Sequence, residues 1–373
     1  MTVMDINRIL DNALWELAKK HDLCHIDTGD VQTVVQQVHD ILLEGSVTMS
    51  NQLITERLSN IRSYRKQLTT LMEMPQVEQR SPEWHDMRKN RLTASDTAAA
   101  MGRGKFETRK GLLKKKAFPE LSPFVSSPIM KWGTMFEPIA LRSYRQRNGD
   151  ITCHEFGLVP HPTVDHYGAS PDGISELGIM LEFKCPPKRK IDGTIPEQYE
   201  IQMQGQLAVC GLRECDYVEC GLEDLHTSEE YIEMVSDTSR TDHGIILEYC
   251  DNAVMTYDYS PEYMTPAEAW KWAQERIKNE QRHLVKITPW RLKEYFTQRV
   301  YFDADRWVGI LKQVSEFWKE VEDMRFKGAE GYFIEKPKQK RREKFNKIIE
   351  FIDDDDDDNT TCASSDSCFS NSL

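Results

Sequence analysis

The sequence predicts an α/β fold in which a central mixed β-sheet is flanked by helices, with further helical segments at the N- and C-terminal ends. Two observations predict it. From residue 79 onward, helical and strand-like patterns alternate irregularly, which is typical of a mixed sheet rather than a purely parallel one. In addition, the 373 residues are 39% hydrophobic and 29% charged, so the chain has enough apolar material for a sizeable core.

Composition excludes several classes of protein. No apolar run approaches the roughly 20 residues of a membrane-spanning helix, and Met1–Asp5 lacks the basic start of a secretory signal. The nine cysteines are odd in number and form no C-x-x-C pair, which favours reduced thiols and an intracellular protein without a zinc or iron–sulfur site. The net charge of −13 means that any nucleic acid must bind through local basic patches.

The first 75 residues read as helices. Apolar residues recur at helical spacing in 5–20 and 31–43, and 55–72 is a third, more polar helix. This region carries no chemistry typical of an active site, so we predict that residues 1–75 form a helical N-terminal extension with an accessory or partner-binding role.

Helix-start signals mark the beginning of the next region. Ser81 followed by Pro82 predicts a capped helix through Arg88. The run from Thr93 to Asp96 predicts a second cap, before an Ala-rich helix that ends near Gly102. Residues 133–147 form a third predicted helix.

Strand signals dominate the middle of the chain. Residues 166–170 and 178–184 are expected to pair as a hairpin around the turn at Pro171-Asp172-Gly173. The remaining predictions are a helix at 196–212, strands at 216–220, 244–249 and 254–259, and helices at 266–284 and 303–324. We therefore expect a domain at 76–285, a helical C-terminal extension at 286–350, and a disordered acidic and Ser-rich tail at 351–373, which contains seven Asp.

A group of charged residues carries the chemistry. Glu182 and Lys184 are two apart on a strand and therefore share a face, whereas Leu181 and Phe183 point into the core. If the hairpin forms, Asp172 converges on Glu182. A set of carboxylate oxygens beside a lysine suits Mg²⁺ or Mn²⁺ acting on a phosphodiester. Taken alone, such a triplet is more often a solvated ion pair, so the context decides.

These residues resemble a known signature. Pro171-Asp172 with Glu182-Phe183-Lys184 is similar to the motif of the PD-(D/E)XK nuclease superfamily. The block from Trp84 to Ser95, then Ser170-Pro171-Asp172-Gly173, Glu182-Phe183-Lys184-Cys185-Pro186 and Gln202-Met203-Gln204 resemble, in this order, the lambda exonuclease (YqaJ-like viral recombinase) family. The resemblance covers roughly residues 79–222 and implies a restriction-endonuclease-like core.

The resemblance also implies roles for individual residues. It assigns catalysis to Asp172, Glu182 and Lys184. It assigns metal binding to Glu137, Asp172, Glu182 and the backbone carbonyl of Phe183, with Glu155 as an alternative to Glu137. It assigns binding of the 5′-phosphate of a DNA end to Arg88, Ser95, Ser170 and Gln202. These types of residue fit the task, since arginine grips phosphate bidentately and a serine that opens a helix lies where an anion is favoured.

Three basic segments are candidates for further contacts. The stretch from Arg103 to Lys116 either grips duplex DNA or forms a solvated helix face, and Lys188-Arg189-Lys190 has the same two interpretations. The segment from Lys336 to Lys344 resembles a nuclear-import or nucleic-acid patch, although such runs often have neither role.

The expected function is therefore that of a Mg²⁺-dependent 5′→3′ exodeoxyribonuclease, with Mn²⁺ as a substitute metal. Acting on double-stranded DNA ends, it would leave 3′ single-stranded overhangs for recombination or replication of a viral or phage genome, in the host cytoplasm or nucleus. The resemblance also implies a single-strand annealing protein as partner and a homotrimer, with no membrane. Two alternatives stay open: a structure-selective endonuclease of the same fold, and a non-catalytic scaffold that binds DNA ends.

Overall fold

The computed structural model describes residues 3–20, 31–45, 47–122, 127–225, 228–235, 242–251 and 254–328. The chain divides into two units, residues 1–323 and residues 324–373, and the description of the second unit stops at residue 328. The predicted basic import segment at 336–344 and the predicted acidic tail at 351–373 lie outside the described residues. The fold described below is that of the first unit.

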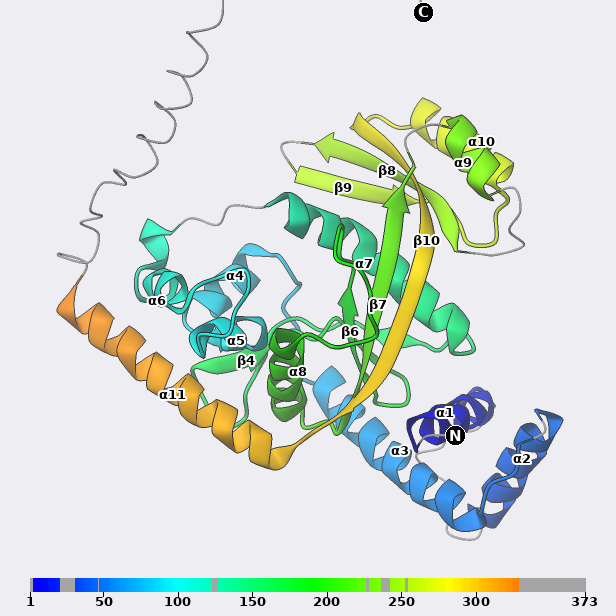
Figure 1. Cartoon of the computed structure of the whole chain (residues 1–373), viewed down its shortest axis with the longest axis horizontal. Helices are drawn as coiled ribbons and strands as arrows, with labels where there is room; N and C mark the ends of the chain where they lie inside the picture. The colour runs from blue at the N-terminus through cyan, green and yellow to red at the C-terminus, as the bar shows by residue number, and fades with distance from the viewer. Residues whose placement is uncertain are drawn as a thin grey trace, which may run out of the picture. The chain divides into compact units, whose positions relative to one another are not determined.

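The centre of the fold is a mixed β-sheet, as predicted (Figure 1). Its seven strands lie in the order β2 (Cys153–His154), β5 (Gly173–Ser175), β6 (Met180–Lys184), β7 (Glu214–Asp224), β10 (His283–Tyr301), β8 (His243–Asp251) and β9 (Val254–Tyr259). Strands β6 and β7 run parallel, and the other neighbours in this sheet are antiparallel. A smaller sheet has the order β1 (Leu92–Thr93), β4 (Tyr167–Ala169) and β3 (Val159–Pro160).

The helices begin and end where local chemistry dictates. They are α1 (Val3–Ala18), α2 (Val31–Glu44), α3 (Asn51–Met72), α4 (Pro82–Lys89), α5 (Thr97–Ala100), α6 (Arg109–Ala117), α7 (Pro128–Arg147), α8 (Glu197–Cys210), α9 (Ser228–Val235), α10 (Pro266–Lys278) and α11 (Ala304–Lys327). The side chain of Ser81 caps α4 as predicted, and Gly211 ends α8 in the left-handed conformation. None of the described helices combines the length and the apolar character needed to cross a bilayer.

Strand β6 carries the predicted catalytic motif between two helices. Leu181 and Phe183 lie in the main hydrophobic core on the α7 side, where the rings of Phe183 and Tyr144 are 6.2 Å apart. Glu182 points to the opposite face and contacts α8. The alternation predicted from the sequence is therefore confirmed, and it places the charged residues of β6 beneath α8.

One strand pairing differs from the prediction. Strand β4 belongs to the small sheet, and the partner of β6 is β5, which the sequence analysis did not separate from the turn. A tight turn joins β5 to β6, with Gly178 at a φ of +74° and its N–H donating to Ser175. The expected hairpin between 166–170 and 178–184 is wrong because the chain leaves the small sheet at Ser170, before the segment that pairs with β6 begins.

The largest departure concerns the C-terminal part. We expected residues 286–350 to be helical, but β10 runs from His283 to Tyr301 and pairs along β7 on one side and β8 on the other. Its aromatic and β-branched residues, such as Ile287, Trp290 and Phe296, suit a strand. The irregular register near Leu292 interrupts the simple alternation, which hides the strand from a search for period two. Helix α11 then follows close to its predicted position.

The N-terminal helices share the core of the sheet. Leu14 of α1, Val38 of α2 and Ile54 of α3 are almost fully buried, in the same apolar cluster as Phe136 and Leu181. The described part of this region therefore forms the predicted helices, but these helices pack into the core of the domain instead of forming a separate extension.

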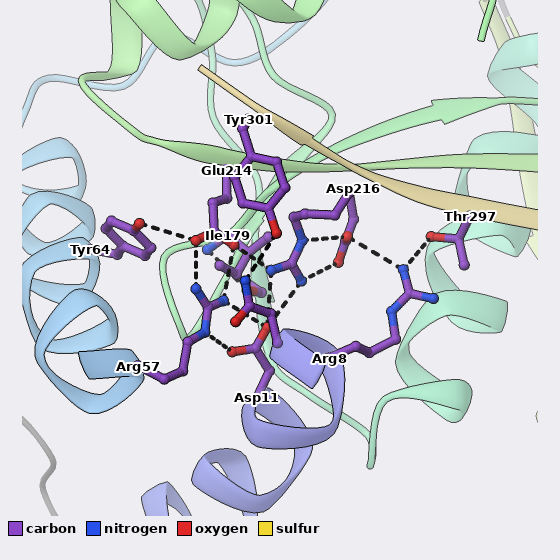
Figure 2. A network of polar contacts seen from close by, with 12 residues as sticks. Arg8, Asp11, Arg57, Tyr64, Ile179, Glu214, Asp216, Thr297 and Tyr301 are labelled. Atoms are coloured by element: carbon purple, nitrogen blue, oxygen red, sulfur yellow. Dashed lines mark hydrogen bonds and ion pairs between the residues drawn. The ribbon is translucent and has the colours of Figure 1, made fainter. Parts of the chain in front are cut away.

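A buried ionic network joins these helices to the sheet (Figure 2). Arg57 of α3 donates two hydrogen bonds to Asp11 of α1, at 2.7 and 2.8 Å, and also pairs with Glu214 of β7. Arg299 of β10 pairs with Asp11, Glu214 and Asp216, and its Nε lies 2.7 Å from Asp216. Each of the five side chains belongs to a residue that is at most 6% exposed.

The network combines three carboxylates with two buried guanidinium groups, and Arg8 supplies a third positive charge 3.6 Å from Asp216 (Figure 2). Burial raises the pKa of Asp216, but Arg299 lowers it by more, so the net shift is downward. The pKa of Glu214 is lowered in the same way by Arg57 and Arg299, against the effect of burial. Removal of one partner would leave a buried charge without compensation, which is strongly destabilising. The network therefore holds α1 and α3 against β7 and β10, next to the predicted catalytic motif.

We predict that Arg57→Met lowers the free energy of unfolding by about 3–5 kcal/mol at pH 7, since Asp11 and Glu214 lose a buried partner. Urea unfolding measures this. The matched control is Arg103→Met, which breaks a pair with Glu197 whose side chains are 48% and 59% exposed and should cost less than about 1 kcal/mol. Equal losses for the two variants would contradict the proposed role of the network.

Candidate active site

Glu182 is the centre of the candidate site. Its side chain is fully buried and accepts hydrogen bonds from Gln202 and Gln206 of α8, each at 2.7 Å, and a third from Lys184. A carboxylate has about four acceptor positions, so these donors leave about one position for a further ligand. The i, i+4 spacing of the two glutamines on one helix face makes this clamp possible.

Asp172 lies beside Glu182, at the entrance to β5. Its Oδ2 accepts a hydrogen bond of 2.7 Å from the backbone N–H of Phe183, which fixes it across the strand pair. Burial and then the negative charges of Glu182 and Glu137 hold the pKa of Asp172 well above its ordinary value. Although the predicted hairpin was wrong, Asp172 and Glu182 do come together as the sequence analysis expected.

Lys184 completes this charged group. Its ammonium bonds to Glu182 and lies 4.9 Å from the ring centre of Tyr199 on α8. Burial lowers the pKa of Lys184, but the charges of Glu182 and Asp172 raise it more, so the net pKa is raised. In this arrangement Lys184 is a hydrogen-bond donor and a positive charge, not a base.

Glu137 approaches the same group from α7. Arg80 donates to it at 3.1 Å, and the Glu137 side chain is 33% exposed. Burial raises the pKa of Glu137, Arg80 and Lys184 lower it, and Glu182 and Glu155 raise it, with a net upward shift. Glu137 therefore lies close enough to Glu182, Lys184 and the alternative ligand Glu155 for their charges to affect its pKa.

The donors of this group suit a hard divalent cation. Three carboxylates face Lys184 and Arg80, which leaves an excess of negative charge. Burial is the main reason that the pKa values of Asp172 and Glu137 are raised, and repulsion from the neighbouring carboxylates adds to it. Oxygen ligands in this number are typical of Mg²⁺ sites. Within the described ranges, however, no set of three or more His, Cys, Asp or Glu side chains is close enough to enclose a metal ion.

The predicted phosphate-binding residues form a second cluster. Arg88 lies 4.2 Å from the ring centre of Trp84 and donates to Ser95 at 3.4 Å. The indole N–H of Trp84 in turn donates to Ser170 at 3.1 Å. Because Ser170 is two residues before Asp172, Trp84 connects the arginine to the carboxylate group. Three of the four predicted residues are thus brought together.

Gln202 is the fourth predicted residue, and the structure places it elsewhere. Its amide donates to Glu182 instead of lining the cluster around Arg88. The helical start predicted for Ser95 also differs. Ser95 lies in a 3₁₀ turn, Ala94–Asp96, before a helix of only four residues, so the N–H groups of a long helix do not serve this cluster.

Two residues support the arginine in a role that the sequence analysis did not give them. Asp96 accepts hydrogen bonds from Thr93 at 2.8 Å and pairs with Lys116 at 2.9 Å. Burial raises the pKa of Asp96, but Lys116 and Arg88 lower it, to about 2. Lys116 also donates to the backbone carbonyl groups of Arg88 and Arg91. The sequence offered one signal for this arrangement: Thr93 lies three residues before Asp96, close enough for their side chains to form a hydrogen bond.

The predicted basic patches are largely neutralised by nearby acids. Arg103 pairs with Glu197, Arg109 makes two bonds of 2.7 Å to Glu320, and Lys115 pairs with Glu107. Lys116 is only 8% exposed. These pairs favour the interpretation of residues 103–116 as a solvated helix face over their interpretation as a continuous surface that grips DNA.

Comparison with known proteins identifies the region that holds both clusters. Residues 83–213 match the family described as YqaJ-like viral recombinase domain. This part of the chain is similar to a YqaJ-like viral recombinase domain. The matched residues include Arg88, Glu137, Asp172, Glu182 and Gln202, so the resemblance predicted from the sequence motifs is confirmed.

Viral proteins are among the relatives. An uncharacterized protein of Acanthamoeba polyphaga mimivirus is 26% identical over 299 residues, which cover 68% of this chain and 54% of that protein. A protein of African swine fever virus is 25% identical over 190 residues, which cover 41% of this chain and 54% of that protein. The chain thus spans about half the length of the curated relatives that it matches.

Among solved structures, the chain is similar to an alkaline exonuclease, LHK-Exo, from Laribacter hongkongensis. The two are 21% identical, with a TM-score of 0.41, and the match covers 72% of this chain and all of that chain.

We predict that Lys116→Met raises the pKa of Asp96 from about 2 toward its ordinary value of 3.8, because the strongest neighbouring positive charge is lost. A carboxyl with a depressed pKa stabilises the fold above its unfolded pKa and loses that contribution as the pH falls. NMR titration of the Asp96 carboxyl measures the shift, with the exposed Lys110→Met as control. An unchanged pKa would exclude Lys116 as its cause.

Proposed function

We propose that this chain is a divalent-metal-dependent deoxyribonuclease that degrades double-stranded DNA 5′→3′ from its ends. The products would be mononucleotides and 3′ single-stranded overhangs that serve recombination or replication of a viral or phage genome. The observation that carries the proposal is the contact of Glu182 with Lys184, Gln202 and Gln206 beside Asp172, inside a YqaJ-like domain.

The chain's own residues perform most of the proposed chemistry. Gln202 and Gln206 hold Glu182 in one orientation, and the backbone N–H of Phe183 does the same for Asp172. The Lys184 ammonium supplies a positive charge where a phosphodiester gains negative charge during hydrolysis. Bound by Glu137, Asp172, Glu182 and the carbonyl of Phe183, Mg²⁺ or Mn²⁺ would supply Lewis-acid polarisation and a lowered pKa for water.

The cluster around Arg88 supports action at a 5′ end. Its guanidinium lies over the ring of Trp84 and near two hydroxyl groups, those of Thr93 and Ser95, which suits a terminal phosphate. The link through Ser170 places this cluster next to Asp172. An arginine that anchors the end would position the first phosphodiester bond at the carboxylates.

The wider biological setting follows from the same family. We propose that the enzyme acts in the host cytoplasm or nucleus, together with a single-strand annealing protein, and that it forms the homotrimer implied by the family resemblance. Two alternatives are a structure-selective endonuclease and a non-catalytic scaffold that binds DNA ends. Rapid nicking of closed circular plasmid would favour the endonuclease.

We predict that the wild-type protein digests linear duplex DNA only with Mg²⁺ or Mn²⁺, prefers a 5′-phosphorylated end, and stops in EDTA. Lys184→Ala and Glu182→Gln should lower the rate by at least about 100-fold while retaining DNA binding, because each removes a group that acts in the transition state. Arg88→Ala should mainly abolish the preference for the 5′-phosphate.

Gel analysis of end-labelled duplex measures these rates, and fluorescence anisotropy in EDTA measures binding. Arg276→Ala, which breaks a pair with Asp258 away from the site, is the control. Digestion by Lys184→Ala at the wild-type rate would refute the assigned chemistry. Binding of ends without digestion under any metal condition would favour the scaffold.

A further inference from the structure

A second polar group lies on β7, the strand that flanks the candidate catalytic strand β6 on the side away from β5. Lys184 of β6 is in register with Glu219 of β7, and Glu182 is in register with Tyr217. Residues in register on neighbouring strands share a face, so Glu219 and Tyr217 lie on the same face as the candidate catalytic residues. None of the roles assigned above involves this pair.

Glu219 is a fully buried carboxylate held by one arginine. Its Oε1 pairs with Arg189, whose side chain is 33% exposed, so the guanidinium reaches from the interior to the surface. In the part of the chain that the structure describes, the other oxygen of Glu219 and the hydroxyl of Tyr217 are both buried without a hydrogen-bond partner. Native proteins seldom leave such atoms unsatisfied, so their presence here indicates a place for a ligand or ordered water.

Aromatic contacts connect this pair to Lys184. The Lys184 ammonium lies 4.9 Å from the ring centre of Tyr199, and that ring stacks on Tyr217 with centres 6.1 Å apart. Burial raises the pKa of Tyr217, whereas Arg189 and Lys184 both act to lower it, so both cations are near its hydroxyl. Arg189 is therefore close to the candidate catalytic lysine.

The two arginines approach the site from different sides of β6. The Arg88 cluster reaches it through Ser170, just before β5, whereas Glu219 lies on β7 and holds Arg189 from the loop that follows β6. Since the sheet order is β5, β6, β7, the catalytic strand lies between them. A DNA strand anchored at Arg88 and cut above β6 would continue toward Arg189.

We infer that Arg189, oriented by Glu219, binds the backbone phosphate that follows the scissile phosphate in the strand being degraded. This inference rests on the proposed function and adds a subsite to it. A guanidinium fork fits a phosphate bidentately, and a buried carboxylate that holds one edge of the fork fixes its direction. The neighbouring Lys188 and Lys190 are exposed and add positive charge to the same loop.

The test removes the charge of single phosphates. Duplexes carry an uncharged methylphosphonate at the second linkage from the phosphorylated 5′ end, or at the fifth linkage as a control. Single-turnover cleavage of the first linkage by the wild-type protein should slow about 10- to 100-fold with the second-linkage substitution, the range expected for a hydrogen bond to a charged group. The fifth-linkage substitution should have little effect.

Arg189→Ala should slow cleavage of unmodified DNA by a similar factor and show no further loss on the second-linkage duplex. Arg189→Ala combined with Glu219→Gln avoids an unpaired buried charge and should behave in the same way. Glu219→Gln alone should give an intermediate loss, because the fork is less firmly held. Arg276→Ala should retain the full wild-type sensitivity to the second linkage.

Equal sensitivity of Arg189→Ala and the wild-type protein to the second-linkage substitution would overturn the inference and leave Arg189 as a partner of Glu219 only. Binding of the same duplexes in EDTA separates this failure from that of the proposed function. If the wild-type protein hydrolyses nothing but its binding weakens at the second linkage in an Arg189-dependent way, the subsite holds and the nuclease activity does not.

Discussion

The arrangement depends on one buried carboxylate. Glu182 is fully enclosed, and burial of an unpaired charge is costly, so the surrounding structure must supply donors to it. Gln202 and Gln206 come from one face of α8, and Lys184 comes from the same strand. This requirement fixes how α8 lies on β6, beside Asp172 and Glu137, the two further carboxylates to which we assign the proposed cation.

The rest of the fold keeps β6 and its neighbours rigid. Strand β10 spans the sheet between β7 and β8, and the network of Arg57 and Arg299 ties the N-terminal helices to the first residues of β7. Gln204, between the two clamp glutamines, bonds to the backbone of Tyr301 and Asp303. Helix α8 is thus anchored on one face to the candidate catalytic carboxylate and on another to the end of β10.

Much of this was predictable because local chemistry decided it. Caps, helical periodicity and the alternation at Leu181–Lys184 depend on nearby residues, and the spaced motifs identified the YqaJ-like domain. Strand β10 was missed because its register shift breaks the alternation, and β5 because three residues give no periodic signal. The ionic partners of Arg57, Asp96 and Arg189 are distant in sequence, so only the tertiary structure could reveal them.

The most direct test of the account is to locate a divalent ion. Crystals of the wild-type protein soaked in Mn²⁺ would be measured for anomalous scattering, with Asp172→Asn as the matched variant. The account predicts an ion bonded to Asp172 and Glu182, with Glu137 on the same ion, and its loss in the variant. An ion bound elsewhere, or a wild-type protein that hydrolyses DNA with no ion at these carboxylates, would contradict it.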